Sequence, residues 1–146
     1  MPSKRIVIIG MGDTGLLTAV RLSREFEIIG VSTRPCMVSG QELGLRLARP
    51  EIWRPTSLIA FDRYRGLDGV EILHGRATAV DTHDRSVEVR CADGSERTLS
   101  YDALLIASGV TNGFWRDDRV LSREQVEAEI DEACAAIERA MAELET

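Results

Sequence analysis

The sequence predicts an α/β fold: a mainly parallel sheet with an inserted antiparallel β-meander and a long C-terminal helix. Three observations predict it. A β-branched run at residues 5–9 leads through a glycine-rich turn into a helical pattern. Residues 70–100 alternate β-branched and polar positions and contain two turn signals. From residue 126 onward, apolar residues recur every three or four positions.

The composition indicates one globular core, because 44% of the 146 residues are hydrophobic. The net charge of -6 argues against nucleic-acid binding. No apolar run approaches the roughly 20 residues that span a bilayer, so we expect no transmembrane segment and a cytoplasmic location. The three cysteines lack C-x-x-C spacing, so neither a disulfide framework nor a metal site is expected.

Residues 5–31 are expected to form a β-α-β unit. Arg5–Ile9 is predicted as a buried strand, the helix runs from Asp13 to about Phe26, and Glu27–Val31 is the second strand. Such a crossover is right-handed and places the two strands side by side in parallel.

The turn inside this unit has the G-x-G-x-x-G spacing of a dinucleotide-binding site. Gly10 permits the tight turn, Gly12 lets a pyrophosphate approach the backbone, and Gly15 lets the helix pack closely on the strand. The helix start at Asp13 and Thr14 supplies unpaired N–H groups for phosphates. A turn without a ligand is the alternative, but its place between a strand and a helix favours a Rossmann-like nucleotide-binding domain.

The acid that usually binds the adenosine ribose is missing from its expected place. It is expected about 20 residues further on, at the end of the second strand, where Ser32 stands. Ser32 or Thr33 can hydrogen-bond a ribose hydroxyl instead, and Arg34 can contact a phosphate or stack on adenine. A hydroxyl residue followed by Arg also suits a 2′-phosphate, which favours NADP. A solvated loop charge explains Arg34 equally well.

The middle of the chain is expected to alternate loops, short helices and strands. A loop covers residues 32–40, and its Cys36 is a candidate redox thiol, although a plain loop thiol is the simpler interpretation. The remaining elements are helices at Gln41–Ala48 and Ser57–Tyr64, a short strand at Val70–Leu73, meander turns at Thr82–Arg85 and Ala92–Ser95, and an apolar strand at Tyr101–Gly109.

The chain is expected to divide into a nucleotide-binding domain (1–110), a connector (111–121) and an amphipathic helix (122–146). Ser122 and Gln125 have capping-box spacing, and Leu121 and Val126 can form a hydrophobic staple. An apolar stripe follows along the helix: Val126, Ile130, Ala133, Ile137, Met141 and Leu144. Such a stripe is normally covered, so we expect it to pack on its own domain or on a second chain.

The meander followed by "YDALLIASG" resembles the FAD-binding domain of two-dinucleotide-fold flavoproteins. The chain is similar to pyridine nucleotide-disulfide oxidoreductase-like proteins, above all the apoptosis-inducing-factor-like and type II NADH dehydrogenase-like ones. The matching stretches are "KRIVIIGMGDTGLLTAVRLS", "GVEILHGRATAVDTHDRSVEV" and "LSYDALLIASGV". The Ala-Thr-Gly of those flavoproteins corresponds to Ala107, Ser108 and Gly109, where Ser108 keeps the hydroxyl.

The resemblance implies FAD pyrophosphate on Gly10–Gly15, adenine near the strand Gly75–Thr78 with Ala77, and Ala107–Gly109 close to the cofactor. It also implies an NAD(P)H-binding domain after the last helix and a later Gly-Asp segment for the flavin, neither of which lies within these 146 residues. The last helix then meets that missing domain or a second chain, as in a homodimer.

We therefore expect the FAD-binding portion of an NAD(P)H-dependent flavin oxidoreductase, with weak or absent FAD binding and no activity by itself. No side chain is assigned as a catalytic acid or base. The alternative is a stand-alone NAD(P)- or ADP-binding sensor or interaction module without turnover. The missing acid favours this alternative, whereas "YDALLIASG" after the meander favours the oxidoreductase.

Overall fold

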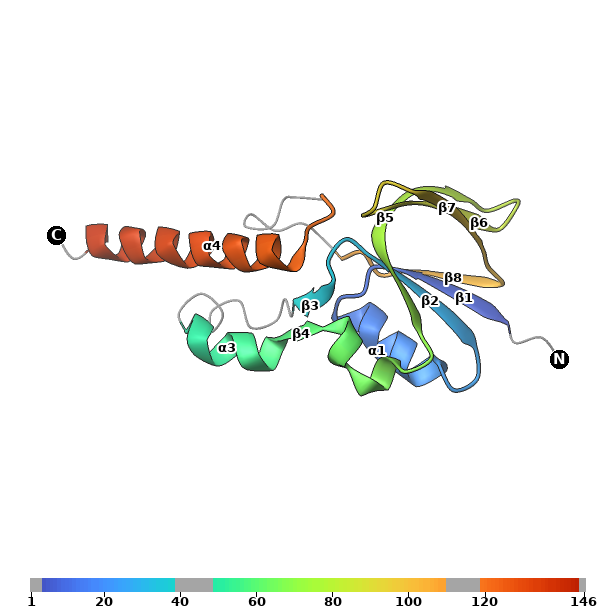
Figure 1. The fold of residues 1–146 in the computed structure, drawn as a ribbon, viewed down its shortest axis with the longest axis horizontal. Helices are drawn as coiled ribbons and strands as arrows, with labels where there is room; N and C mark the ends of the chain where they lie inside the picture. Colours follow the sequence, from blue (N-terminus) through green and yellow to red (C-terminus); the bar gives the residue numbers. More distant parts are fainter. Residues whose placement is uncertain (1–3, 39–48, 110–118, 145–146) are drawn as a thin grey trace.

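The computed structural model describes residues 4–38, 49–109 and 119–144, and its main feature is a six-stranded sheet. The strand order is β7-β6-β5-β2-β1-β8 (Figure 1). β1 (Arg5–Ile9) pairs in parallel with β2 (Glu27–Ser32) on one side and with β8 (Ala103–Ile106) on the other. The predicted β-α-β unit and the strand that returns beside it after the meander are both confirmed.

The helix of this unit, α1 (Asp13–Leu22), ends four residues before the predicted Phe26. The chain turns there, because the Phe26 N–H donates to the Leu22 carbonyl at 3.1 Å. The Glu27 N–H then donates to the Lys4 carbonyl at 3.1 Å, which starts the pairing of β2 with β1. The helix is therefore shortened by the turn that brings the chain back to the sheet.

β5 (Glu71–Asp81) belongs to both the parallel sheet and the meander. Residues 71–74 pair in parallel with β2, and from Gly75 onward the strand pairs antiparallel with β6 (Ser86–Cys91). The predicted separate strand at Val70–Leu73 is thus the first part of one longer strand. Gly75 allows this continuity, because a Cβ there would lie 2.6 Å from the Arg90 carbonyl oxygen. β7 (Glu96–Ser100) completes the predicted meander.

The two faces of the sheet carry separate hydrophobic clusters. One face packs against α1 and two short 3-10 helices, η1 (Phe61–Arg63) and η2 (Arg65–Leu67). Its buried members are Ile8, Met11, Leu16, Ala19, Ile28, Phe61 and Leu67. The meander covers the other face, where the buried members are Val7, Ile29, Val31, Val87, Val89 and Leu99. Neighbouring residues of β1 and β2 thus point to opposite faces, as expected of strands.

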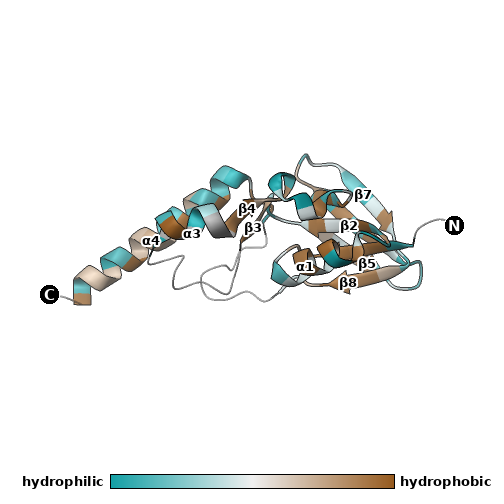
Figure 2. Ribbon diagram, turned by 90° about the horizontal axis from the view of Figure 1, so that it is seen from below, coloured by the Kyte–Doolittle hydropathy of each residue, from teal (hydrophilic) through white to brown (hydrophobic). Residues whose placement is uncertain are grey.

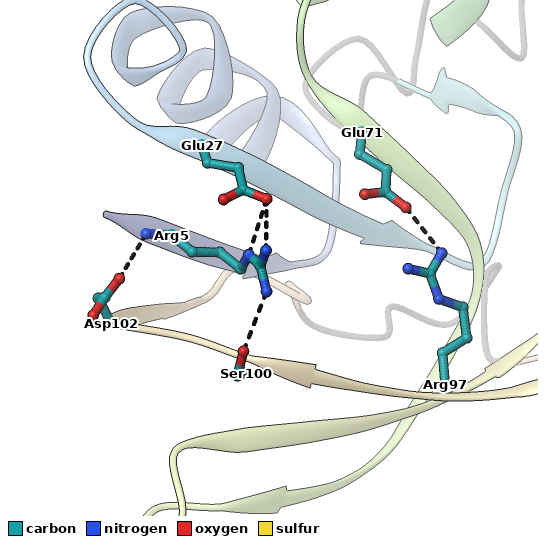
Figure 3. Close-up of polar contacts among 6 residues, drawn as sticks. All are labelled: Arg5, Glu27, Glu71, Arg97, Ser100 and Asp102. Carbon is teal, nitrogen blue, oxygen red and sulfur yellow. Dashed lines mark hydrogen bonds and ion pairs between the residues drawn. The ribbon is translucent and has the colours of Figure 1, made fainter. Parts of the chain in front are cut away.

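Polar contacts around Arg5 tie the amino ends of the parallel strands together (Figure 3). The guanidinium group pairs with Glu27 at 2.8 Å and also donates to the Ser100 hydroxyl at 3.2 Å. The Arg5 backbone N–H donates to a carboxylate oxygen of Asp102 at 2.7 Å. These contacts join β1, β2 and the approach to β8 at one end of the sheet.

A second ion pair, Arg97 with Glu71 at 2.9 Å, joins β7 to the start of β5 (Figure 3). All four of these side chains in ion pairs are partly exposed, so each pair contributes at most about 1 kcal/mol. The location of the two ion pairs is more informative than their energy. Both pairs lie toward the amino ends of the parallel strands, opposite the edge that carries the glycine-rich turn.

A small two-stranded ribbon lies outside the main sheet. It pairs β3 (Cys36–Val38) with β4 (Leu58–Ala60) antiparallel, so the predicted loop over 32–40 contains a strand. α3 (Pro50–Ser57) precedes β4. The predicted helix at Ser57–Tyr64 is wrong, because residues 58–60 pair with β3 instead. The predicted helix at Gln41–Ala48 and residues 111–118 of the predicted connector lie outside the described residues.

The last helix, α4 (Arg123–Leu144), begins with the predicted capping box. The Ser122 N–H donates to the Gln125 side-chain oxygen at 2.8 Å, and the Gln125 N–H donates to the Ser122 hydroxyl at 3.3 Å. Leu121 and Val126, the predicted staple, are both buried in one cluster. Within the described residues, no helix has the combination of length and apolar character needed to cross a membrane.

The first half of α4 packs on its own domain, and the helix then extends away from the sheet (Figure 1). A third cluster joins it to the ribbon through the buried residues Cys36, Leu121, Val126, Ile130 and Cys134. An ion pair between Arg54 and Asp131 links α3 to α4. Further along, hydrophobic and hydrophilic residues alternate on the helix (Figure 2), and Met141 and Leu144 are 59% and 87% exposed.

Replacing Ser122 with Ala should remove one half of the capping box. We expect the free energy of unfolding to fall by about 0.5–2 kcal/mol, because a helix N–H loses its acceptor. Urea denaturation followed by circular dichroism measures the change. Ser122→Thr keeps the hydroxyl and serves as the matched control. Equal stability of the Ala and Thr variants would contradict a capping role for this hydroxyl.

Candidate nucleotide-binding site

The turn after β1 brings three strand ends together at the carboxyl edge of the parallel sheet. The Gly10 N–H donates to the Val31 carbonyl at 2.9 Å, which ties the turn to the end of β2. Gly10 has a φ of +97°, and a Cβ there would lie 2.4 Å from the Ala107 carbonyl oxygen, just after β8. Only glycine fits this position, because both the conformation and the close backbone approach exclude a side chain.

Gly15 and Gly12 have opposite surroundings in the same turn, because Gly15 is closely packed and Gly12 is open. A Cβ on Gly15 would lie 1.9 Å from the Gly10 carbonyl oxygen, so its absence lets α1 pack on the turn. A Cβ on Gly12 would meet nothing within 4 Å, so this residue borders open space. Gly12 is also the N-cap of α1 and contributes no side-chain cap. Open space beside the uncapped N–H groups of a helix start suits a phosphate.

Asp13 and Thr14 form the first turn of α1. Asp13 is half-buried and Thr14 is exposed. The Thr14 carbonyl accepts a hydrogen bond from the Thr18 hydroxyl, one turn further along the helix, at 2.8 Å. The carboxylate of Asp13 interacts favourably with the helix dipole. Asp13 therefore stabilises the helix end that borders the open space at Gly12.

A short loop follows β2, and a hydrogen bond to the Ser32 side chain closes it. The Ser32 side chain is buried, and its hydroxyl oxygen accepts the Arg34 N–H at 3.2 Å. The hydroxyl proton remains able to donate to a ligand. The Thr33 carbonyl accepts the Leu121 N–H at 2.9 Å, so this loop is also joined to the chain that enters α4. Arg34 is half-buried beside these groups.

The residues after β8 complete the edge. The Ala107 N–H donates to the Ile9 carbonyl at 2.7 Å, which holds the backbone of Ala107 and Ser108 against Gly10. Ser108 is exposed, and Gly109 has a φ of +72°, a conformation that suits glycine. The structure therefore brings the glycine turn, the end of β2 and Ala107–Gly109 to one place.

Ala77 has different surroundings from the other predicted residues. It lies in the antiparallel half of β5, opposite Val89 of β6, and packs against the cluster under the meander. The proposed contact of this residue with adenine stays a prediction.

His74 lies beside the end of β2, in a position that the sequence did not indicate. It lies opposite Ser32 in the pairing of β5 with β2. Its Nε2 atom lies 3.0 Å from the carbonyl oxygen of Leu121. A single histidine within a strand pattern gives no sign of a partner 47 residues away.

Cys36 lies in β3 rather than in a loop, and its side chain is buried. Burial raises the pKa of the Cys36 thiol, while the nearby guanidinium groups of Arg123 and Arg34 act in the opposite direction. A raised pKa lowers the fraction of reactive thiolate at neutral pH. The environment therefore favours a structural thiol in the third cluster over a redox role.

The sequence profile described as pyridine nucleotide-disulphide oxidoreductase matches residues 4–132. The chain belongs to this family. No curated protein matches the chain in sequence.

Solved structures show the same fold within the family. NDH2 from Plasmodium falciparum in complex with NADH is 22% identical, with a TM-score of 0.58 over 77% of this chain and 24% of its own. The sulfide:quinone oxidoreductase from Aquifex aeolicus is 20% identical, with a TM-score of 0.62 over 89% of this chain and 31% of its own. The water-forming NADH oxidase from Lactobacillus brevis bound to NADH is 18% identical, with a TM-score of 0.61 over 89% of this chain and 32% of its own.

The likeness to these structures is one of fold. It confirms the predicted class, a Rossmann-like FAD-binding domain with a parallel sheet, an inserted meander and a C-terminal helix. This family member spans about a quarter to a third of the length of the structures it resembles.

Proposed function

We propose that this chain is the FAD-binding portion of an NAD(P)H-dependent flavin oxidoreductase and is inactive without an NAD(P)H-binding domain. The observation that carries the proposal is the contact of the glycine turn at Gly10 with Ala107 and Ser108, which follow the meander. Membership of the pyridine nucleotide-disulphide oxidoreductase family supports it. So do the structural neighbours, two of which were solved with NADH.

The residues of the turn fit a dinucleotide pyrophosphate. Open space at Gly12 lets phosphate oxygens reach the first N–H groups of α1, and the helix dipole favours their negative charge. Ser108 lies against the same turn, and Ser108 and Gly109 would border the bound cofactor. FAD supplies the hydride-accepting chemistry when bound, while the protein provides binding and orientation.

The adenosine half of the site fits less well. Ser32 offers a neutral hydroxyl where a carboxylate is usual, and hydrogen bonds to a charged acceptor are roughly twice as strong. We therefore propose that the isolated chain binds FAD weakly or not at all.

Turnover needs more than these 146 residues. Hydride transfer requires the nicotinamide and flavin atoms to be held roughly 3–3.5 Å apart. In the proposed enzyme a further domain positions the nicotinamide. The exposed distal part of α4, with Met141 and Leu144, would face that domain or a second copy of the chain.

A second candidate is a stand-alone module that binds NAD(P) or ADP without turnover. The observation in its favour is Ser32 followed by the half-buried Arg34 at the end of β2, an arrangement that suits a 2′-phosphate. A preference for NADP over both FAD and NAD would support this candidate against the flavin site.

Gly12→Val should abolish nucleotide binding, because its side chain fills the space proposed for the pyrophosphate. Isothermal titration calorimetry with ADP measures this effect, because phosphates should bind at the turn even if FAD does not. Thr98→Val, on exposed β7, is the matched control and should bind as the wild type does. Undiminished binding by the Gly12 variant would place the site elsewhere.

Ser32→Glu should tighten FAD binding about fivefold without producing NADH or NADPH turnover, because it adds a charged acceptor but no nicotinamide-binding domain. Ser32→Gln controls for side-chain size and should not tighten it. NAD(P)H consumption with a quinone acceptor measures turnover. Steady NADH oxidation above that of free FAD, in the wild type or either variant, would contradict the proposed dependence on another domain.

A further inference from the structure

Leu121, just before α4, is held in place by two hydrogen bonds and by the packing of its side chain. Its N–H donates to the Thr33 carbonyl at 2.9 Å. Its carbonyl oxygen lies 3.0 Å from His74 Nε2. Its side chain is only 2% exposed and belongs to the third cluster with Val126. The N–H and the carbonyl of Leu121 are thus both hydrogen-bonded at the carboxyl edge of the sheet, to Thr33 just after β2 and to His74 in β5.

The His74 contact has a defined direction. A carbonyl oxygen only accepts hydrogen bonds, so Nε2 carries the proton and donates it. His74 lies on β5 and pairs in register with Ser32, the last residue of β2. The imidazole therefore extends from β5, beside Ser32, to Leu121, whose own N–H is hydrogen-bonded to the Thr33 carbonyl.

The loop over Ser32, Thr33 and Arg34 depends on this arrangement. One hydrogen bond closes it from within, from the Arg34 N–H to the Ser32 hydroxyl. A second hydrogen bond joins the loop to a distant segment of the chain, from the Leu121 N–H to the Thr33 carbonyl. Thr33 is thus hydrogen-bonded to Leu121, and His74 is one of the groups that hold Leu121 in place.

We propose that His74 is a positioning residue for the adenosine end of the bound nucleotide. It acts through Leu121, which holds Thr33 and so sets the conformation of the loop that carries Ser32 and Arg34. The proposal rests on the proposed function, because it takes this loop as the ribose site. It goes beyond that function by making adenosine recognition depend on a residue outside the glycine turn.

The two ends of the ligand should then respond differently to His74. Phosphates bind at the glycine turn, which is held by Gly10, Gly15 and Ala107. The adenosine end binds at the loop after β2. Loss of the His74 hydrogen bond therefore weakens ligands that contain adenosine and leaves inorganic pyrophosphate unaffected.

The test measures the affinities of ADP and inorganic pyrophosphate for the 146-residue chain by isothermal titration calorimetry. His74→Leu should weaken ADP binding about threefold to tenfold, the worth of one hydrogen bond. Pyrophosphate affinity should not change. His74→Gln should bind ADP as the wild type does, because its amide nitrogen can donate from nearly the same place as Nε2.

Two further variants complete the experiment. In His74→Asn the side chain is polar but too short to reach Leu121, so its ADP affinity should equal that of His74→Leu. This variant tests the proposal even if His74→Leu does not fold. His83→Leu is the matched control, because His83 is exposed in the turn between β5 and β6. Circular dichroism establishes that each variant is folded during the titration.

Two results would overturn the proposal, and a third would overturn the proposed function. Equal ADP affinity in wild type, His74→Asn and His74→Gln would show that the hydrogen bond has no part in recognition. Equal weakening of ADP and pyrophosphate would show a general structural effect. Binding of neither ligand by the wild type would instead refute the proposed function itself, which separates the two failures.

Discussion

The contact of the first turn of α1 with the turn after β1 leaves no room for a side chain at Gly15, where a Cβ would lie 1.9 Å from the Gly10 carbonyl oxygen. Gly10 in turn abuts the backbone of Ala107 and Ser108 beyond β8. This double contact fixes α1, β1 and β8 relative to one another. The open side of the turn, at Gly12, is a face of this junction that a ligand can reach.

The rest of the molecule supports that edge from different directions. Arg5 and its partners hold the amino ends of the strands, and the meander covers the sheet face opposite α1. α4 is joined to the carboxyl edge through Leu121, so the helix that leaves the sheet begins at the loop proposed to hold the ribose. The loop proposed to hold the ribose and the start of α4 are therefore linked by adjoining hydrogen bonds.

Local patterns predicted the parts of the fold that local physics decides. Apolar runs indicated β1, β2 and β8, and the Ser122–Gln125 spacing indicated the start of α4. The ribbon was missed because β3 and β4 have three residues each, and their pairing overrode the helical pattern expected after Ser57. In the site, the glycine motif indicated the turn, but the contact of His74 with Leu121 depends on tertiary structure.

In the proposed site, the open side of the Gly10–Gly15 turn binds the phosphates of a dinucleotide. Amide chemical shifts in ¹⁵N–¹H NMR spectra, recorded as ADP is added, report such binding residue by residue. The largest shifts should occur at Gly12, Asp13 and Thr14, with smaller ones at Ser108 and Gly109. Adenosine, which lacks phosphates, should leave the three amides of the turn unchanged. Unchanged turn amides at saturating ADP, or equal shifts with adenosine, would contradict the claim.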